Sequence, residues 1–189
     1  LIVGGIGAAG VSTEALDDRL GARGYPAMGS TGTAFSLGAY RILRSGVMLG
    51  AEWTGMNIGD GDTPDGQDVG LGGGHGTFGI GYMFELSKRA RIYPRLGLGG
   101  GGMGLWFETD STIVGFDDVL ANPQPVPARR DPVLSRGGVV IDFGAGVEFL
   151  LSKRGSGLLL GLRFGYLPAP TSNDWRLYEA TVPDGPDAS

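Results

Sequence analysis

The chain has 189 residues with 38 glycines, 11 prolines and no cysteine, which indicates one folded domain and excludes a disulfide framework or a thiolate metal site. Its 20 acidic residues outnumber its 15 basic ones, and the net charge of -5 excludes the basic excess of a general nucleic-acid binder. No stretch approaches the roughly 18 consecutive apolar residues of a transmembrane helix, so a helical membrane protein is excluded.

Seven segments in chain order show the two-residue alternation of a β-strand with two different faces. They cover residues 1–12, 32–43, 46–56, 75–87, 90–107, 138–151 and 157–167. None has a sustained helical period. In the first connection, STEALDDRLGARG predicts a short helix that begins after Ser12 or Thr13 and stops at Gly21 or Gly24.

Short and long connections alternate along these strands. LRSG, LSKRAR and LSKRGSG form three tight turns, whereas the long connections span 13–31, 57–74, 108–137 and 168–189. Strict alternation places all turns at one end of the sheet and all loops at the other, as in outer-membrane barrels. Basic residues lie in the turns and aspartates in the loops, so the two ends differ in charge. The pattern predicts an all-β, antiparallel up-and-down transmembrane barrel.

Each strand has a large apolar face and a face of glycine and polar residues. In the fourth strand the apolar face carries Phe78, Ile80, Tyr82 and Phe84. A soluble lipocalin-like barrel would turn this face inward around an apolar ligand. We place it on lipid instead, because glycine weakens a strand on a solvent face but fits the narrow interior of a small barrel.

The inward face then carries charges that must pair. They are Glu52, Glu85, Arg95, Asp142, Glu148 and Arg163. Glu148 and Arg163 flank one tight turn, as Glu85 and Arg95 flank another, so each pair could meet across its hairpin. These residues predict a charge network that plugs the lumen, and the alternative is a set of unrelated solvated charges.

YPRLGLGGG, GVVIDFGAGVEF and GLLLGLRFGY are similar to strands of small outer-membrane barrels related to outer membrane proteins A and X. The resemblance covers nearly the whole chain in pattern, and it implies a single eight-stranded barrel domain, residues 1–189, with a packed interior. Only seven strands are visible, and an open edge in a bilayer would leave backbone groups unpaired in hydrocarbon. We therefore expect an eighth strand beyond Ser189 or from another chain.

His75 is the only histidine, and Thr77 follows it on the same face. Some lipid A deacylases and acyltransferases of the outer membrane use a histidine with a serine near the external rim. Here no local serine accompanies His75 and no GxSxG elbow occurs, so an ordinary rim histidine is favoured and no enzyme is predicted.

The segment GDGDTPDGQDVG gathers carboxylates of the kind that calcium prefers. They are Asp60, Asp62, Asp65 and Asp68. Their spacing misses the EF-hand pattern and no glutamate occupies the twelfth position, so solvated loop charge is favoured and no metal site is assigned.

These patterns predict a protein of the bacterial outer membrane with a structural or surface-interaction role and no cofactor. Its acidic external loops would meet outer-membrane lipids, lipopolysaccharide, other envelope proteins or copies of itself. The chain opens on LIVGGIGAAG without the features of an export signal, so we expect such a signal to have been removed. A soluble lipocalin-like barrel, a lipid A acyl hydrolase or transferase, and a small pore stay open as alternatives.

Overall fold

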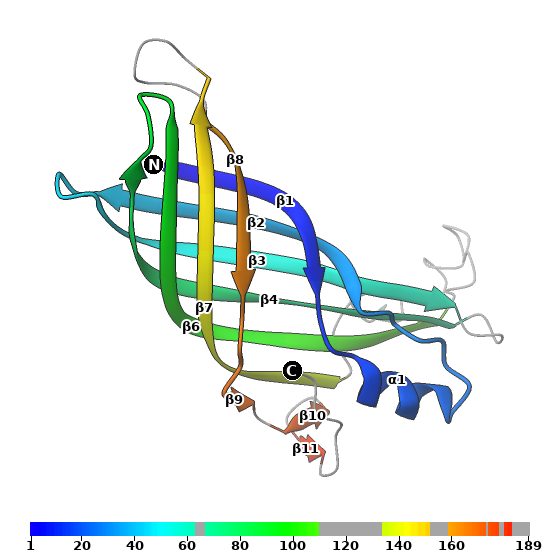
Figure 1. Ribbon diagram of the computed structural model, residues 1–189. Coiled ribbons are helices and arrows are strands. Elements are labelled where there is room, and N and C mark those ends of the chain that lie inside the picture. Colours follow the sequence, from blue (N-terminus) through cyan, green and yellow to red (C-terminus); the bar gives the residue numbers. More distant parts are fainter. Residues whose placement is uncertain (63–66, 110–133, 152–158, 173, 178–179, 183–189) are drawn as a thin grey trace, which may run out of the picture.

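The computed structural model describes residues 1–62, 67–109, 134–151, 159–172, 174–177 and 180–182. Their strands form one antiparallel sheet, in which seven long strands follow one another in chain order (Figure 1). These are β1 (Ile2–Gly10), β2 (Thr31–Ile42), β3 (Val47–Asp62), β4 (Gln67–Tyr82), β6 (Ala90–Thr109), β7 (Leu134–Leu150) and β8 (Leu159–Tyr166). Each pairs with the next. The predicted all-β, antiparallel up-and-down arrangement of seven strands is confirmed.

Four short strands extend the sheet at its ends. β5 (Phe84–Glu85) pairs with β6 beside the turn between β4 and β6. β9 (Thr171–Ser172) and β10 (Trp175–Leu177) pair with β7 beyond the end of β8, and β11 (Ala180–Val182) pairs with β10. After β8, the chain therefore continues to pair with β7 through β9 and β10, and it reverses direction in β11.

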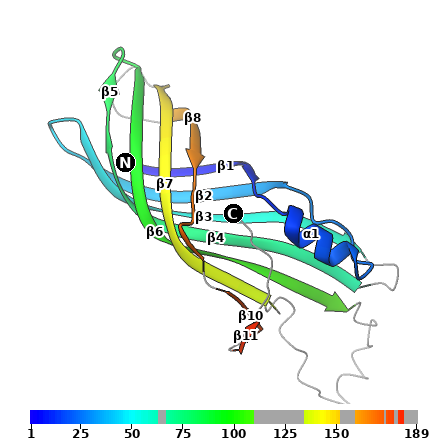
Figure 2. The same ribbon diagram turned by 60° about the horizontal axis from the view of Figure 1, so that its bottom comes forward.

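The sheet is strongly coiled and forms a half-barrel. In Figure 1, β1 to β4 run across the view, whereas β8 and the upper parts of β6 and β7 run vertically, and Figure 2 shows the same curl from another side. β1 and β8 are the outermost of the long strands. Within the described part of the chain they do not meet, since no Cα of β1 lies within 8 Å of a Cα of β8.

The connections from β2 to β3, from β4 to β6 and from β7 to β8 leave one end of the sheet, which we call the turn end, and the other connections leave the opposite end, which we call the loop end. The tight turn between β2 and β3 closes at Gly46, whose amide donates to the carbonyl of Leu43 (3.0 Å) and whose φ of 88° favours glycine. At the loop end, α1 (Glu14–Gly21) follows Thr13 and confirms the predicted helix. Among the described residues, no helix is long and apolar enough to cross a membrane.

The expected long loop over residues 57–74 is wrong, because most of it is strand. Pairing between β3 and β4 continues with a shift at Ile58 as far as Asp62 opposite Asp68, which leaves only residues 63–66 as a connection. Ile58, Val69 and Leu71 are buried on the inner side of this extension. Their burial stabilises strands where the frequent glycines and aspartates had indicated a loop.

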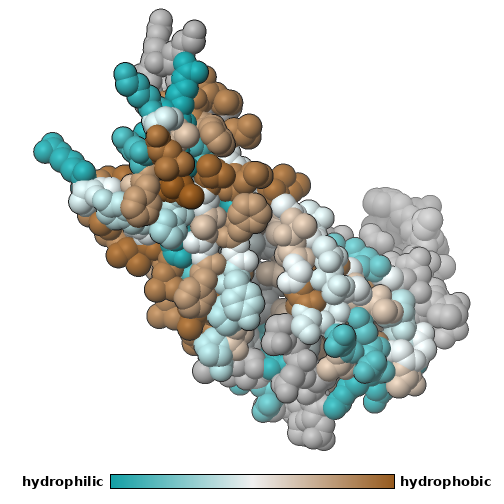
Figure 3. Space-filling view, in the orientation of Figure 1, coloured by the Kyte–Doolittle hydropathy of each residue, from teal (hydrophilic) through white to brown (hydrophobic). Residues whose placement is uncertain are grey.

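The outer and inner faces of the sheet differ in polarity, with the apolar face outside as predicted. Phe78 is 79% exposed on the outside, whereas Asp142 is 2% exposed on the inside. Hydrophobic side chains gather over the strands toward the turn end, and paler, more hydrophilic ones surround α1 (Figure 3). A lipocalin-like interior is contradicted, because the side chains that would line it are exposed. These are Phe78, Ile80, Tyr82 and Phe84.

Apolar side chains change face along the long strands. On β6, Leu96 and Leu98 are exposed on the outside, whereas Leu105, nearer the loop end, is buried inside. The loop-end half of the interior is filled by an apolar cluster. It comprises Leu16, Leu20, Met28, Ile58, Val69, Leu71, Leu105 and Trp175. Because α1 contributes the first two of these residues, the helix closes the loop end over the cluster.

Candidate functional site: a polar cluster inside the half-barrel

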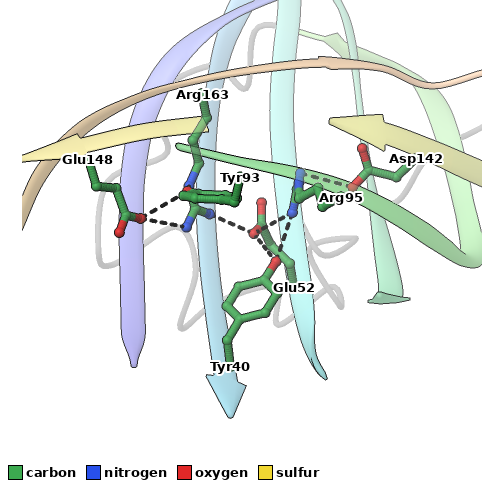
Figure 4. Close-up of polar contacts among 7 residues, drawn as sticks. All are labelled: Tyr40, Glu52, Tyr93, Arg95, Asp142, Glu148 and Arg163. Atoms are coloured by element: carbon green, nitrogen blue, oxygen red, sulfur yellow. Dashed lines mark hydrogen bonds and ion pairs between the residues drawn. The ribbon is translucent and has the colours of Figure 1, made fainter. Parts of the chain in front are cut away.

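The turn-end half of the interior holds a polar cluster that five strands build together (Figure 4). Its members are Tyr40 on β2, Glu52 on β3, Tyr93 and Arg95 on β6, Asp142 and Glu148 on β7, and Arg163 on β8. Inward glycines make room for it. In the register row that joins Tyr40 to Asp142, the three strands between them carry Gly50, Gly79 and Gly97.

Glu52 is the centre of the polar cluster. Its Oε2 accepts hydrogen bonds from the hydroxyl of Tyr40 (2.6 Å), Nη1 of Arg95 (2.8 Å) and Nη1 of Arg163 (2.8 Å). Charge-assisted bonds of this length are the strong ones. Since Arg163 lies on β8 and Glu52 on β3, this contact crosses the interior and ties one side of the half-barrel to the other.

Two further carboxylates bind the outer sides of the two guanidinium groups. Nη2 of Arg95 lies 2.9 Å from Oδ2 of Asp142. Nη2 of Arg163 lies 3.5 Å from Oε1 of Glu148, and the hydroxyl of Tyr93 donates to the same Oε1 (2.9 Å). Acidic and basic groups therefore alternate across the lumen. The three carboxylates and two guanidinium groups leave this cluster with a net charge of -1.

Glu85 does not join the other five predicted network residues. It lies on β5 beyond the turn-end rim, where its register partner is Arg91 rather than Arg95. Its side chain is 71% exposed and forms an ion pair of 3.7 Å with Arg91. The predicted pairing of Glu85 with Arg95 is therefore wrong, because β4 ends at Tyr82 and the strand resumes in β5 outside the interior.

Tyr40 and Tyr93 belong to the polar cluster in addition to the charged residues that the sequence predicts. Both are buried, and both hydroxyl groups bind a carboxylate and a guanidinium group. The two-residue alternation of a strand indicates this position. Tyr93 lies two residues from the inward Arg95, and Tyr40 lies two residues from the inward Gly38, so each tyrosine shares the inward face of its strand. An aromatic residue on the glycine-rich face of a strand points into a small barrel.

His75 lies inside rather than at a rim, between the polar and apolar clusters. Thr54 on β3 is its register partner, and Ser36 on β2 is the partner of Thr54. Hydroxyl side chains therefore do accompany His75, but from distant parts of the sequence. The register places these three side chains in one row across β2, β3 and β4.

Three of the four aspartates that were considered as a possible cation-binding group lie on strands rather than in a loop. Asp60 and Asp62 lie on β3 and Asp68 on β4, whereas Asp65 lies outside the described residues. The side chain of Asp60 accepts a hydrogen bond from Asn57 (3.1 Å). Within the described ranges, no group of three or more His, Cys, Asp or Glu residues is placed to hold a metal ion.

The loop end is closed by residues 11–30, which we call the cap. Oδ1 of Asp17 accepts the backbone amide of Met28 (2.8 Å), and the hydroxyl of Thr13 lies 2.9 Å from Oδ2 of Asp17 and from the carbonyl of Gly29. These contacts hold the two ends of the cap together. Leu16 and Leu20 then pack into the apolar cluster.

Comparison with models of known protein families, with curated proteins and with solved structures finds no significant match for this chain.

Proposed function

We propose that this chain is the barrel of an integral outer-membrane protein with a closed lumen and a structural or surface-interaction role. One observation carries the proposal: large apolar side chains cover the outside of the sheet while ionised groups are buried inside. A water-soluble protein gains stability from the opposite arrangement. In a bilayer, apolar side chains contact lipid, and the polar groups pair in the interior.

The length of the exposed apolar face supports this proposal. On β7 the outward positions from Val139 to Phe149 are all apolar. This span matches the roughly 9–11 residues with which a tilted strand crosses a bilayer. On β4 and β6 the glycines that follow toward the loop end, such as Gly76 and Gly100, carry no side chain to contact lipid. The membrane would then cover the turn-end half of the long strands, and the loop-end half would project from it.

A closed lumen favours a structural or surface role over a pore or an enzyme. The polar cluster crosses the turn-end half, and the apolar cluster with its cap fills the loop-end half. His75 lies between the two, away from the outer surface where lipid A would approach. The parts left to meet partners are the outer face, which would contact lipid and lipopolysaccharide, and the acidic loop end, which would meet other envelope proteins or copies of the chain.

The experiment that tests the membrane proposal is flotation of the refolded chain with phospholipid vesicles. We expect it to float with the vesicles and to stay with them after an alkaline carbonate wash. A chain that remains monodisperse in buffer without detergent would rule out the proposal. In planar bilayers we expect no steady conductance, and a stable open channel would contradict the closed lumen.

A further inference from the structure

The turn end carries a group of basic side chains directly beyond the outer apolar face. We propose that this group binds the anionic headgroups of phospholipids in the leaflet at the turn end, so that acidic phospholipids gather around that end of the chain. The inference rests on the proposed membrane location, and it names the class of lipid that the turn end selects. We call the group the basic collar, and it consists of Arg41, Arg44, Lys88 and Arg89.

The positive charge of the basic collar is not balanced by neighbouring acidic groups. All four side chains are exposed, and within the described part of the chain none of them forms an ion pair. Only the adjacent Arg91 is paired, with Glu85 at 3.7 Å. Residues 41–46 and 85–91 therefore hold five basic side chains against one acidic one, which leaves a net charge of +4 at the turn end.

The basic collar begins where the apolar side chains of the outer face end. On β2, the exposed Leu37 and Ala39 are followed at the next outward position by Arg41. Beyond β5, Lys88 lies two residues after Leu86, which is 64% exposed and ends the outward apolar series of that hairpin. Figure 3 shows hydrophilic side chains at the tips of both turns, next to the hydrophobic ones over the strands. The collar therefore marks the turn-end margin of the apolar face.

Hydrogen bonds hold the two turns of the basic collar in place. The backbone amide of Met83 donates to the carbonyl of Gly46 (2.9 Å), which joins the turn between β2 and β3 to the end of β4. In the next turn, the backbone amide of Arg89 donates to the hydroxyl of Ser87 (3.2 Å). The carbonyl of Arg89 accepts the backbone amide of Leu150 of β7 (2.8 Å). These contacts fix the backbone from which the basic side chains project.

An anionic phospholipid matches this arrangement better than a soluble anion does. A phospholipid carries acyl chains and a phosphate in one molecule, so it contacts the exposed Leu86 and the neighbouring Lys88 together. Long basic side chains at the margin of an apolar surface lay their stems along it and keep the charged end at the level of the headgroups. A soluble anion would leave the adjacent apolar side chains in water. Each basic residue near an anionic membrane surface strengthens binding by about fivefold.

The loop end lacks this positive charge, so an anionic leaflet favours the turn end over it. The cap has three acidic residues against two basic ones, Arg19 and Arg23, and Asp60 lies on the loop-end part of β3. Arg19 and Arg23 are exposed, as the members of the basic collar are. Replacement of these two arginines removes the same charge as replacement of two collar residues, and it therefore provides a matched control.

The experiment measures which phospholipid lies next to the turn end. Because the chain has no cysteine, Ser45→Cys in the turn between β2 and β3 allows a single fluorophore to be attached there. The labelled chain is refolded into vesicles of phosphatidylcholine mixed with phosphatidylglycerol. Quenching of the fluorophore by phosphatidylglycerol that is spin-labelled near the headgroup is compared with quenching by phosphatidylcholine labelled in the same way. Flotation with vesicles of phosphatidylcholine alone, followed by an alkaline carbonate wash, tests insertion separately.

We expect phosphatidylglycerol to be preferred next to the label by about fivefold or more, and higher salt to reduce this preference. Arg44→Gln combined with Arg89→Gln should lower the preference by about fivefold or more. The charge-preserving Arg44→Lys with Arg89→Lys should keep it, as should the matched control Arg19→Gln with Arg23→Gln.

Three results would overturn this inference while the chain still floats with phosphatidylcholine vesicles. They are equal quenching by the two lipids, an equal effect of the two glutamine variants, and loss of the preference in an excess of glycerophosphoglycerol, which has the headgroup without acyl chains and would indicate a site for soluble anions. A chain that does not float with the vesicles would overturn the proposed function, and this inference with it.

Discussion

Replacement of Glu52 tests whether the polar cluster holds the half-barrel together. In Glu52→Ala, the hydroxyl of Tyr40 and the guanidinium groups of Arg95 and Arg163 lose a shared acceptor at 2.6–2.8 Å. A hydrogen bond to a charged group contributes about 1.5–3 kcal/mol, but three bonds to one oxygen are not additive. Removal of one partner from a buried ion pair costs about 3–5 kcal/mol, and we expect a loss of this size in the free energy of unfolding.

The measurement is urea unfolding in phospholipid vesicles, followed by tryptophan fluorescence. Glu85→Ala is the matched control, because its ion pair with Arg91 is long and exposed, and such a pair contributes about 0–1 kcal/mol. Equal losses of stability in the two variants would refute a stabilising role of the polar cluster, since burial and the number of hydrogen bonds would then have no effect. Loss of stability in Glu52→Ala with an unchanged denaturant slope would locate the effect in the folded state.

Three further predictions concern the outer face, the interior glycines and the cap. Phe78→Arg should lose about 2–4 kcal/mol of folding stability in vesicles if this position faces lipid. The control Leu177→Arg, at the loop end, should change the folding stability by about 0.5 kcal/mol or less. Equal effects of the two substitutions would argue against lipid contact at Phe78. Gly99→Ala should cost about 1–3 kcal/mol in the same assay, because the added Cβ would overlap the carbonyl of Gly76. Gly76→Ala should be tolerated, because its Cβ would meet no atom within 4 Å. A larger loss in Gly76→Ala than in Gly99→Ala would contradict the register. Asp17→Ala should speed trypsin cleavage within the cap, because the amide of Met28 and the hydroxyl of Thr13 lose their partner, and unchanged cleavage would show that Asp17 does not hold the cap.

Much of the fold can be predicted from the sequence, because the residue types of a strand with two different faces alternate with a period of two. The alternation from Ile141 to Phe149 predicts both the strand and its outer face, and tight turns such as LRSG predict which strands are neighbours. The sequence does not predict the extension of β3 and β4, and the reason is physical. Its stability comes from Val69 and Leu71 packing against α1 and β6, and no local propensity of a segment rich in glycine and aspartate reports that packing.

The polar cluster was predictable as a set of charges but not as a set of contacts. Alternation assigns Glu52, Arg95 and Arg163 to the inner face, yet only the register between strands determines which of them meet. Glu85 shows the limit of a prediction from alternation alone. Its position in the alternation assigns it to the inner face, but it lies on β5, beyond the turn-end rim, where its side chain is exposed. Tyr93 shows the opposite limit, because it carries no charge that would assign it to the network, yet its hydroxyl binds Glu148 inside.

The two halves of the interior are explained by one change of environment along the same strands. Where the outside of β6 carries Leu96 and Leu98, the inside carries the charged Arg95. Where the outside carries Gly100 and Gly102, the inside changes to Met103 and the buried Leu105. Apolar side chains thus face outward in one half and inward in the other, which is what a strand requires if lipid surrounds the first half and water the second. The proposed membrane boundary, the paired charges and the capped apolar cluster are therefore consequences of the same alternation.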